Sequence, residues 1–226
     1  MIRVNSLSKK YKNNILFDNV NLSFESNKIS FLLGKNGSGK TSLIKCMFDL
    51  EKYDGNILFD ENNVNRVRKE CFVIWDDAPF YTNLTGLQNL DILSENEFSK
   101  SEIIECALKY LGMDILKRKV KTYSYGQRKK LALILVDLLQ PKYLVMDEIS
   151  NGLDYESVCE LKEQIKKWSD NMTIILTGHQ FSFYNNIVDD IYIVKDKTII
   201  PHITDFQNKK ESLEELYDEE LLEIRD

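Results

Sequence analysis

Histidine, cysteine and proline are scarce in this 226-residue sequence, which contains two, four and three of them. The cysteines form no CxxC pair and stand far apart, at Cys46, Cys71, Cys106 and Cys159. Zinc sites and disulfide frameworks need clustered or paired ligands, so both are excluded and reduced core thiols are expected. Glycine is also sparse, at nine residues, which excludes collagen-like and low-complexity chains.

Long apolar runs are missing as well. The best candidate, Leu131–Leu139, has nine residues and contains Asp137, whereas a membrane-spanning helix needs about 20 apolar residues. The N-terminal segment lacks the apolar stretch of a secretory signal. We therefore expect no membrane span, and a cytoplasmic location unless a partner holds the chain elsewhere.

The net charge of −6 is concentrated at the C-terminus. Residues 211–226 contribute −7 and the rest of the chain +1. A nearly neutral body argues against nucleic-acid binding driven by bulk charge, and no nucleic-acid partner is expected. Basic residues cluster at Arg66–Lys69, Lys117–Lys121 and Arg128–Lys130. We interpret each cluster as a solvated face or a patch close to phosphate.

Hydrophobic periodicity predicts a β/α core that is interrupted by helices. Strands are expected at Ile2–Asn5, Val20–Phe24, Ile29–Leu33, Asn56–Phe59, Cys71–Trp75, Tyr143–Met146, Thr173–Leu176 and Ile191–Val194. Helices are expected at Thr41–Leu50, Leu87–Leu93, Ser101–Leu111, Gly126–Leu139 and Glu156–Trp168. The expected division is a catalytic core of residues 1–84 and 141–210, a helical insertion of residues 85–140 and an acidic C-terminal helix of residues 211–226.

The C-terminal helix is expected to be amphipathic. Ser212 and Glu215 have capping-box spacing, and one face carries Leu213, Leu216, Tyr217, Leu221 and Ile224. Docking of this stripe on the chain's own core is favoured, and docking on a partner or dimer mate is the alternative.

A phosphate-binding loop is the most specific motif. Gly34–Thr41 reads GKNGSGKT and satisfies GxxxxGK[ST] between a predicted strand and a predicted helix. Glycines let backbone N–H groups turn toward phosphate oxygens, and the helix N-terminus adds a positive dipole end. Lys40 would reach the β- and γ-phosphates, and the Thr41 hydroxyl would ligate Mg²⁺.

Two acids, Asp147 and Glu148, end the apolar strand that begins at Tyr143. Beside a phosphate loop, Asp147 would hold the Mg²⁺ shell and Glu148 would polarise the attacking water. The alternative, two exposed loop acids, is disfavoured once the phosphate loop is considered.

Three further motifs are weaker when taken singly. Ser124 in Tyr123–Gln127 can cap a helix whose free N–H groups bind an anion, although ordinary capping explains it equally well. Asn151–Asp154 follows the two acids directly. His179 ends the strand at Thr177 and could contact a γ-phosphate, whereas a surface histidine is the usual alternative.

Taken together and in this order, the motifs resemble those of the ATP-binding subunits of ABC transporters over residues 2–200. Tyr123–Gln127 resembles the signature LSGGQ, Ser150–Asp154 the D-loop and His179 the switch histidine, while Tyr11 stands where an aromatic stacks on adenine. The resemblance implies an α/β fold with a P-loop NTPase (RecA-like) core, an inserted all-helical signature subdomain and a small N-terminal antiparallel β part. It implies ATP and Mg²⁺ as cofactors, with catalysis by Glu148 and His179, metal contacts from Thr41, Asp76 and Asp147, and nucleotide contacts from Tyr11, Gly34, Asn36, Gly37, Ser38, Gly39, Lys40, Thr41, Ser42, Ser124, Gly126, Gln127 and Asp154.

The sequence departs from the family pattern at several motif positions. Asp76, next to Asp77, stands where the family's Q-loop has glutamine, and Tyr123 and Tyr125 replace Leu and Gly of the signature. These changes are expected to affect the rate of ATP hydrolysis and its coupling to transport more than the binding of ATP. A carboxylate that reaches Mg²⁺ predicts a steeper Mg²⁺ dependence of ATP binding; the alternative is that Asp76 caps a turn before Pro79 and faces solvent.

The resemblance also implies partners. Two ATP-binding subunits pair head to tail, each signature completing the other's ATP site, and together they drive a separately encoded membrane permease. The chain would then sit on the cytoplasmic face of the cell membrane, with export of a small molecule or peptide as the leading function. The alternative is a soluble ABC ATPase that acts on an Fe–S scaffold or in translation. A non-hydrolysing regulatory subunit is disfavoured because Glu148 and His179 are present.

Overall fold

The computed structural model describes residues 1–77, 79–209 and 211–222. Its strands are β1 (Ile2–Tyr11), β2 (Asn14–Phe24), β3 (Ile29–Leu33), β4 (Asp54–Phe59), β5 (Cys71–Ile74), β6 (Tyr143–Asp147), β7 (Thr173–Thr177), β8 (Asp190–Lys195) and β9 (Thr198–Ile203). Its helices are α1 (Lys40–Met47), α2 (Val64–Val67), α3 (Gly86–Leu93), α4 (Lys100–Ala107), α5 (Met113–Leu116), α6 (Tyr125–Leu139), α7 (Tyr155–Ser169), α8 (Phe181–Tyr184) and α9 (Leu213–Leu221). Short 3₁₀ turns occur at Arg68–Glu70, Val120–Thr122 and Phe206–Asn208.

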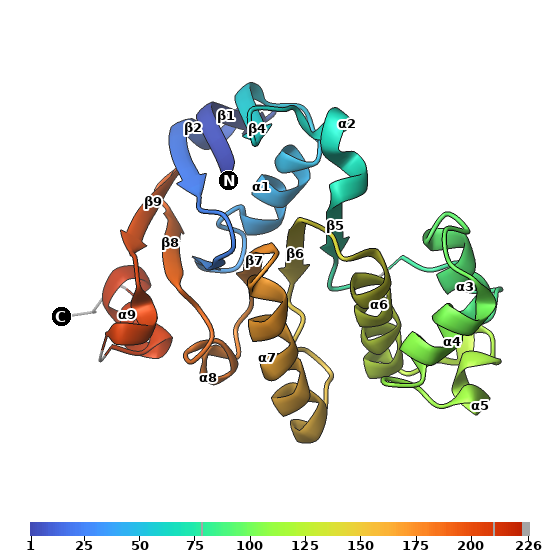
Figure 1. The fold of residues 1–226 in the computed structure, drawn as a ribbon. Coiled ribbons are helices and arrows are strands. Elements are labelled where there is room, and N and C mark those ends of the chain that lie inside the picture. Colours follow the sequence, from blue (N-terminus) through green and yellow to red (C-terminus); the bar gives the residue numbers. More distant parts are fainter. Residues whose placement is uncertain (78, 210, 223–226) are drawn as a thin grey trace.

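A six-stranded sheet with the order β5-β6-β7-β3-β8-β9 forms the centre of the molecule (Figure 1). All its pairings are parallel except that of β9 with β8. Every residue of β3, β6 and β7 is buried. Helices cover both faces of a parallel sheet, which is why these strands are continuous apolar runs in the sequence.

A three-stranded antiparallel sheet, β2-β1-β4, lies above α1 in Figure 1. The α1 side chains Leu43, Ile44 and Met47 belong to the core that this sheet shares with one face of the large sheet. The expected end of the first strand at Asn5 is wrong, because β1 continues to Tyr11. Backbone pairing with β2, which begins at Asn14, holds this polar stretch while its side chains alternate between core and solvent.

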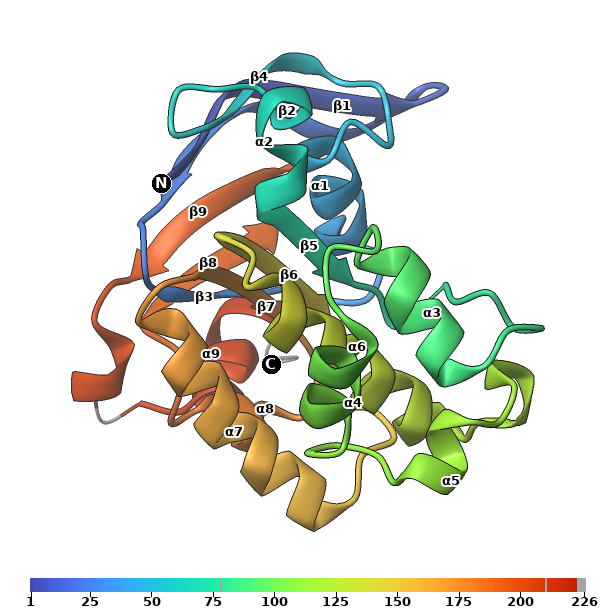
Figure 2. The same cartoon turned by 45° about the vertical axis from the view of Figure 1, so that its right-hand side comes forward.

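The opposite face of the large sheet is covered by α7, α8 and α9, with α6 beside them (Figure 2). Leu213, Leu216 and Leu221 of α9 are buried in the same core as residues of β3 and β7. The predicted docking of the C-terminal stripe on the chain's own core is therefore confirmed for these residues. Ile224, which completes the stripe in the sequence, lies outside the described residues.

The inserted helices α3 to α6 have an apolar core of their own, which includes Leu90, Ala107 and Leu131. The expected helix start at Ser101 is wrong. The Ser99 hydroxyl caps α4 by accepting from Glu102 N at 3.3 Å, and Glu102 Oε2 accepts from Ser99 N at 2.8 Å. In a capping box the acid lies three positions after the capping serine; Glu102 has that spacing from Ser99 but directly follows Ser101.

The predicted α/β fold, with its small antiparallel sheet and inserted helices, is confirmed. Among the residues that the structure describes, no helix is long and apolar enough to cross a bilayer.

Candidate functional site

The predicted catalytic motifs follow three neighbouring strands of the large sheet. β7 lies between β6 and β3, and all three are parallel. Their carboxyl ends therefore meet at one edge, where ligands of open α/β sheets bind. The phosphate loop follows β3, Asp147 ends β6 and His179 follows β7. Asp147 pairs in register with Thr177.

The loop between β3 and α1 depends on glycine at two positions. Gly37 and Gly39 have φ of 79° and 112°, a region in which other residues are strained. At Gly39 an added Cβ would also come within 2.7 Å of the Phe17 ring. The loop leads directly into α1, whose first turn has no acid. Its free N–H groups and dipole therefore suit an anion.

Lys40 and Thr41 begin α1 and face the two acids. The Lys40 ammonium is buried and donates to the carbonyl oxygens of Gly34 at 2.6 Å and Lys35 at 3.2 Å. Burial lowers the Lys40 pKa, while the negative charges of Glu148 and Asp147 oppose that shift. Lys40 therefore provides a positive charge beside the helix N-terminus, which suits a polyphosphate.

Asp147 is held by two hydroxyl groups. Thr41 Oγ1 donates to Asp147 Oδ2 at 3.2 Å, and Thr177 Oγ1 donates to Asp147 Oδ1. Within the described parts of the chain, no three His, Cys, Asp or Glu side chains are grouped so that they could hold a cation alone. A hydroxyl beside a carboxylate is instead the oxygen donor set that Mg²⁺ uses together with substrate phosphates. Thr41 and Asp147 fit that requirement.

Glu148 lies next to His179 at the same edge. His179 Nε2 is 3.4 Å from Glu148 Oε1 and 2.6 Å from Asn36 Oδ1. The Glu148 backbone has φ of 54°, a strained value for a residue other than glycine. Burial raises the Glu148 pKa, and the nearby His179 and Lys40 oppose that shift. A carboxylate with a raised pKa beside a phosphate loop is suited to accept a proton from water.

An open pocket of about 450 Å³ brings many of the predicted residues together. Its lining includes Tyr11, Asn36, Gly37, Gly39, Lys40, Thr41, Ser42, Asp76, Asp147 and Glu148. The predicted signature contacts lie elsewhere. A different pocket, of about 340 Å³, is lined by Ser124, Gly126, Gln127 and Asp154.

Tyr11 lies at the rim of the 450 Å³ pocket with 43% of its surface exposed. Its hydroxyl lies 3.0 Å from Ser42 Oγ and donates to Glu51. The Lys9 ammonium is 4.5 Å from the centre of the Tyr11 ring. These contacts hold the ring at the pocket, where an adenine could stack on it.

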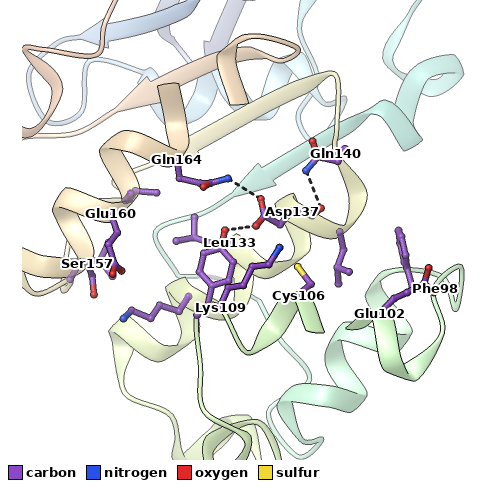
Figure 3. A pocket seen from close by; sticks show the side chains of 15 residues that line it. Phe98, Glu102, Cys106, Lys109, Leu133, Asp137, Gln140, Ser157, Glu160 and Gln164 are labelled. Carbon is purple, nitrogen blue, oxygen red and sulfur yellow. Dashed lines mark hydrogen bonds between the residues drawn. The ribbon is translucent and has the colours of Figure 1, made fainter. Parts of the chain in front are cut away.

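A larger pocket, of about 560 Å³, lies between α4, α6 and α7 (Figure 3). It contains Asp137, which accepts from Tyr110 Oη at 2.6 Å, Gln164 Nε2 at 3.1 Å and Trp168 Nε1 at 2.8 Å. No predicted nucleotide contact lines this pocket. Its hydrogen bonds join the inserted helices to α7 and therefore serve the fold.

The structure also brings to the site three residues that the sequence analysis did not include among the predicted site residues. Thr177 contacts Asp147, Asn151 Nδ2 lies 3.4 Å from Glu148 Oε2, and Lys129 contacts the Glu148 backbone. Of the two interpretations of Arg128–Lys130, the solvated face is wrong for Lys129, whose side chain is only 1% exposed. Thr177 could have been predicted from its place at the end of a strand, two residues before His179. No feature of the adjacent sequence distinguishes Lys129 from its basic neighbours Arg128 and Lys130.

Comparisons with known proteins agree with this geometry. Residues 17–151 match the family model described as ABC transporter. A lantibiotic transport ATP-binding protein of Streptococcus pyogenes is 31% identical over 98% of both chains. The chain belongs to the ABC transporter family. A bacitracin transport ATP-binding protein of Enterococcus faecalis is 32% identical over 90% of this ABC subunit and 69% of the relative.

Solved structures share the fold of this ABC subunit. An ATP-binding subunit of an ABC transporter superimposes with a TM-score of 0.85 at 22% identity, covering 97% of this chain and 98% of that one. A dimeric ATP-binding cassette in a post-hydrolysis state with ADP and Pi gives a TM-score of 0.81 at 18% identity, covering 90% and 98%. The family membership makes the chain an ATP-binding ATPase that energises a transporter.

Proposed function

We propose that this chain is one of two ATP-binding subunits that pair head to tail around two ATP molecules. The pair would drive a separately encoded permease. One observation carries this proposal: within one chain, the signature residues Ser124 and Gly126 line a different pocket from Lys40 and Thr41. A second subunit that supplies its signature would complete the ATP site. The chain then sits at the cytoplasmic face of the membrane, where its permease holds it.

In this proposal the pocket of about 450 Å³ holds ATP. The backbone of Gly34–Thr41 and the Lys40 ammonium bind the phosphates, and Tyr11 stacks on the adenine. Thr41 and Asp147 hold Mg²⁺, which neutralises phosphate charge when bound. Glu148 takes the proton of the attacking water, and His179 orients the γ-phosphate and Glu148.

The transported substrate is proposed to be a small molecule or peptide that leaves the cell. Support comes from the relatives named for lantibiotic and bacitracin transport, which match this chain over 98% and 90% of its length. Both names concern peptide antibiotics, so a peptide of this class is the substrate to test first.

The test uses the chain purified in detergent from the membranes of its own cells. We expect it to be recovered with an integral membrane protein in fixed ratio, and the reconstituted complex to hydrolyse ATP faster when a peptide antibiotic is supplied. A Lys40→Ala subunit in the same complex is the matched control and should remain inactive. Recovery of the chain only with a soluble Fe–S scaffold or with ribosomes would contradict the proposal and favour the soluble alternative.

A further inference from the structure

Two of the positions at which this chain departs from the family pattern contact each other. The Tyr125 hydroxyl donates to the Asp76 carbonyl oxygen at 2.9 Å and also to the Asp76 carboxylate. Tyr125 is the first residue of α6, and Asp76 follows β5. The contact therefore joins the inserted helices to the edge of the large sheet that carries the ATP site.

Lys129 lies one turn further along α6 and completes this contact. Its ammonium is 3.4 Å from Asp76 Oδ1, donates to the Glu148 carbonyl oxygen at 3.1 Å and lies 5.2 Å from the centre of the Tyr125 ring. A buried ammonium is costly unless it is paired and hydrogen-bonded. Asp76 supplies the charge, and the Glu148 backbone supplies a second acceptor.

The Glu148 backbone needs such support. Its φ of 54° is strained for a residue other than glycine. Its N–H donates to Thr177 O and Thr177 Oγ1, both at 3.2 Å. Its carbonyl oxygen accepts from Lys129 Nζ at 3.1 Å and from Asn151 N at 3.2 Å. The N–H and the carbonyl group flank the Cα of Glu148. Hydrogen bonds to both groups therefore fix the direction in which the side chain leaves the backbone.

We propose that Lys129 is a positioning residue for Glu148, and that Asp76 and Tyr125 hold Lys129 in place. This inference rests on the proposed role of Glu148 as the base. Lys129 does not line the nucleotide pocket, so its effect is on turnover and not on ATP affinity. The orientation of α6, and with it that of the signature, is thereby linked to the catalytic glutamate of the same chain.

The inference also accounts for an aspartate where the family has glutamine. Oδ1 of Asp76 is within reach of Lys129, Tyr125 and Asn151 Nδ2, the last at 3.5 Å. A neutral glutamine would leave the Lys129 ammonium buried without a counter-charge. Asp76 therefore serves the lysine, in place of the Mg²⁺ contact that its position suggests.

The test compares ATP hydrolysis by the full chain and by Lys129→Met, Asp76→Asn and the double variant. A misplaced base costs up to about 100-fold, so we expect Lys129→Met to lose about 10- to 100-fold in kcat with KM for ATP within about 2-fold. Asp76→Asn should also lose kcat. Because the two residues act as a pair, the double variant should lose less than the product of the single losses. Lys28→Met is the control, since it likewise breaks a lysine–aspartate pair with one buried member, here Asp190 at 3.3 Å, away from the ATP site.

Several outcomes would overturn the inference. Parental kcat in either single variant is one, and losses that multiply in the double variant are another. Should Lys129→Met not fold, Asp76→Asn decides alone, with circular dichroism to verify its fold, because the side chain that it changes is 51% exposed. A Mg²⁺ dependence of ATP affinity that shifts in Asp76→Asn, with kcat unchanged, would assign Asp76 to the cation instead.

Glu148→Gln in the same series separates this inference from the proposal on which it rests. If Glu148→Gln turns over ATP at the parental rate, the role of Glu148 itself is wrong. If Glu148→Gln is inactive while Lys129→Met keeps the parental kcat, only the inference about Lys129 is wrong.

Discussion

At the scale of single residues, chemistry depends on side chains that the backbone holds in costly conformations. Glu148 has a positive φ and a raised pKa, and Lys40 has a lowered pKa; burial is the main cause of both shifts. Such shifts often mark functional sites, because burial strengthens each charge interaction. Two predictions concern Glu148, and a third concerns the aromatic side chain at the rim of the pocket.

Glu148→Gln should retain ATP binding and lose about 10²–10⁴-fold in turnover, because the amide keeps the shape of the side chain but cannot accept a proton. Binding is measured by titration with ATP and turnover by release of phosphate. Lys40→Ala is the contrasting variant, which should lose binding itself. Parental turnover in Glu148→Gln would show that another group is the base.

The pH dependence of kcat/KM should report the raised Glu148 pKa. The carboxyl can act as a base only when deprotonated, so activity should fall as pH falls through a pKa above the ordinary glutamate value of 4.5. The profile is measured with circular dichroism at each pH, so that acid unfolding is separated from titration. Activity that stays level down to pH 4.5 would contradict this assignment.

Tyr11→Ala should weaken ATP binding about 5- to 100-fold, since stacking of an aromatic ring on a base contributes about 1–3 kcal/mol. Tyr11→Phe is the matched control, because it keeps the ring and removes only the hydroxyl that contacts Ser42 and Glu51. Equal affinity for the parent and both variants would show that the ring does not touch the nucleotide.

At the scale of elements, α9 packs against the segment that carries the switch histidine. Leu213 N donates to Asn185 Oδ1 at 2.7 Å, and the rings of Phe181 and Tyr217 lie 5.2 Å apart. Phe181 begins α8, two residues after His179. The acidic charge of α9 faces solvent while its leucines reach the core, as expected of an amphipathic helix.

Leu216→Ala should lower the free energy of unfolding by about 2–5 kcal/mol, the range for a buried leucine, because Leu216 is only 2% exposed. Leu222→Ala is the control on the same segment, and its 47% exposure predicts a change within about 0.5 kcal/mol. Urea unfolding of the isolated chain gives both values. If the two variants were equally stable, the stripe would serve a partner instead.

At the scale of the whole molecule, the phosphate pocket and the signature pocket of one chain are separate. A head-to-tail pair with two-fold symmetry places each signature at the partner's phosphate loop. Function should then be shared between subunits, and that can be tested by mixing two inactive variants.

Lys40→Ala and Ser124→Arg should each be inactive alone, and their mixture should recover activity. In the mixed dimer, one site combines an intact phosphate loop with an intact signature. Random pairing with independent sites would restore roughly a quarter of the parental rate. The mixture is assayed against each variant at the same total concentration. A mixture as inactive as its components would argue against the head-to-tail pair.

The sequence alone predicted the phosphate loop, the paired acids and the strands of the central sheet, because each depends on contiguous residues. A buried parallel strand is a continuous apolar run, and a phosphate loop needs glycine at fixed spacing. Since β3, β6 and β7 are parallel, their following residues had to share one edge. The contact of Thr41 with Asp147 could therefore be expected from topology.

Only the tertiary structure decided which charges are buried and which residues they contact. Lys129 stands between Arg128 and Lys130, and the sequence does not show that it points inward. Its partner Asp76 is 53 residues away, and their contact depends on how α6 packs against β5. The pattern of polar and apolar residues predicts the conformation and the exposed face of a single helix or strand. The partner of a buried charge is set instead by packing between elements. A charge that is removed from water is destabilising unless an opposite charge lies beside it.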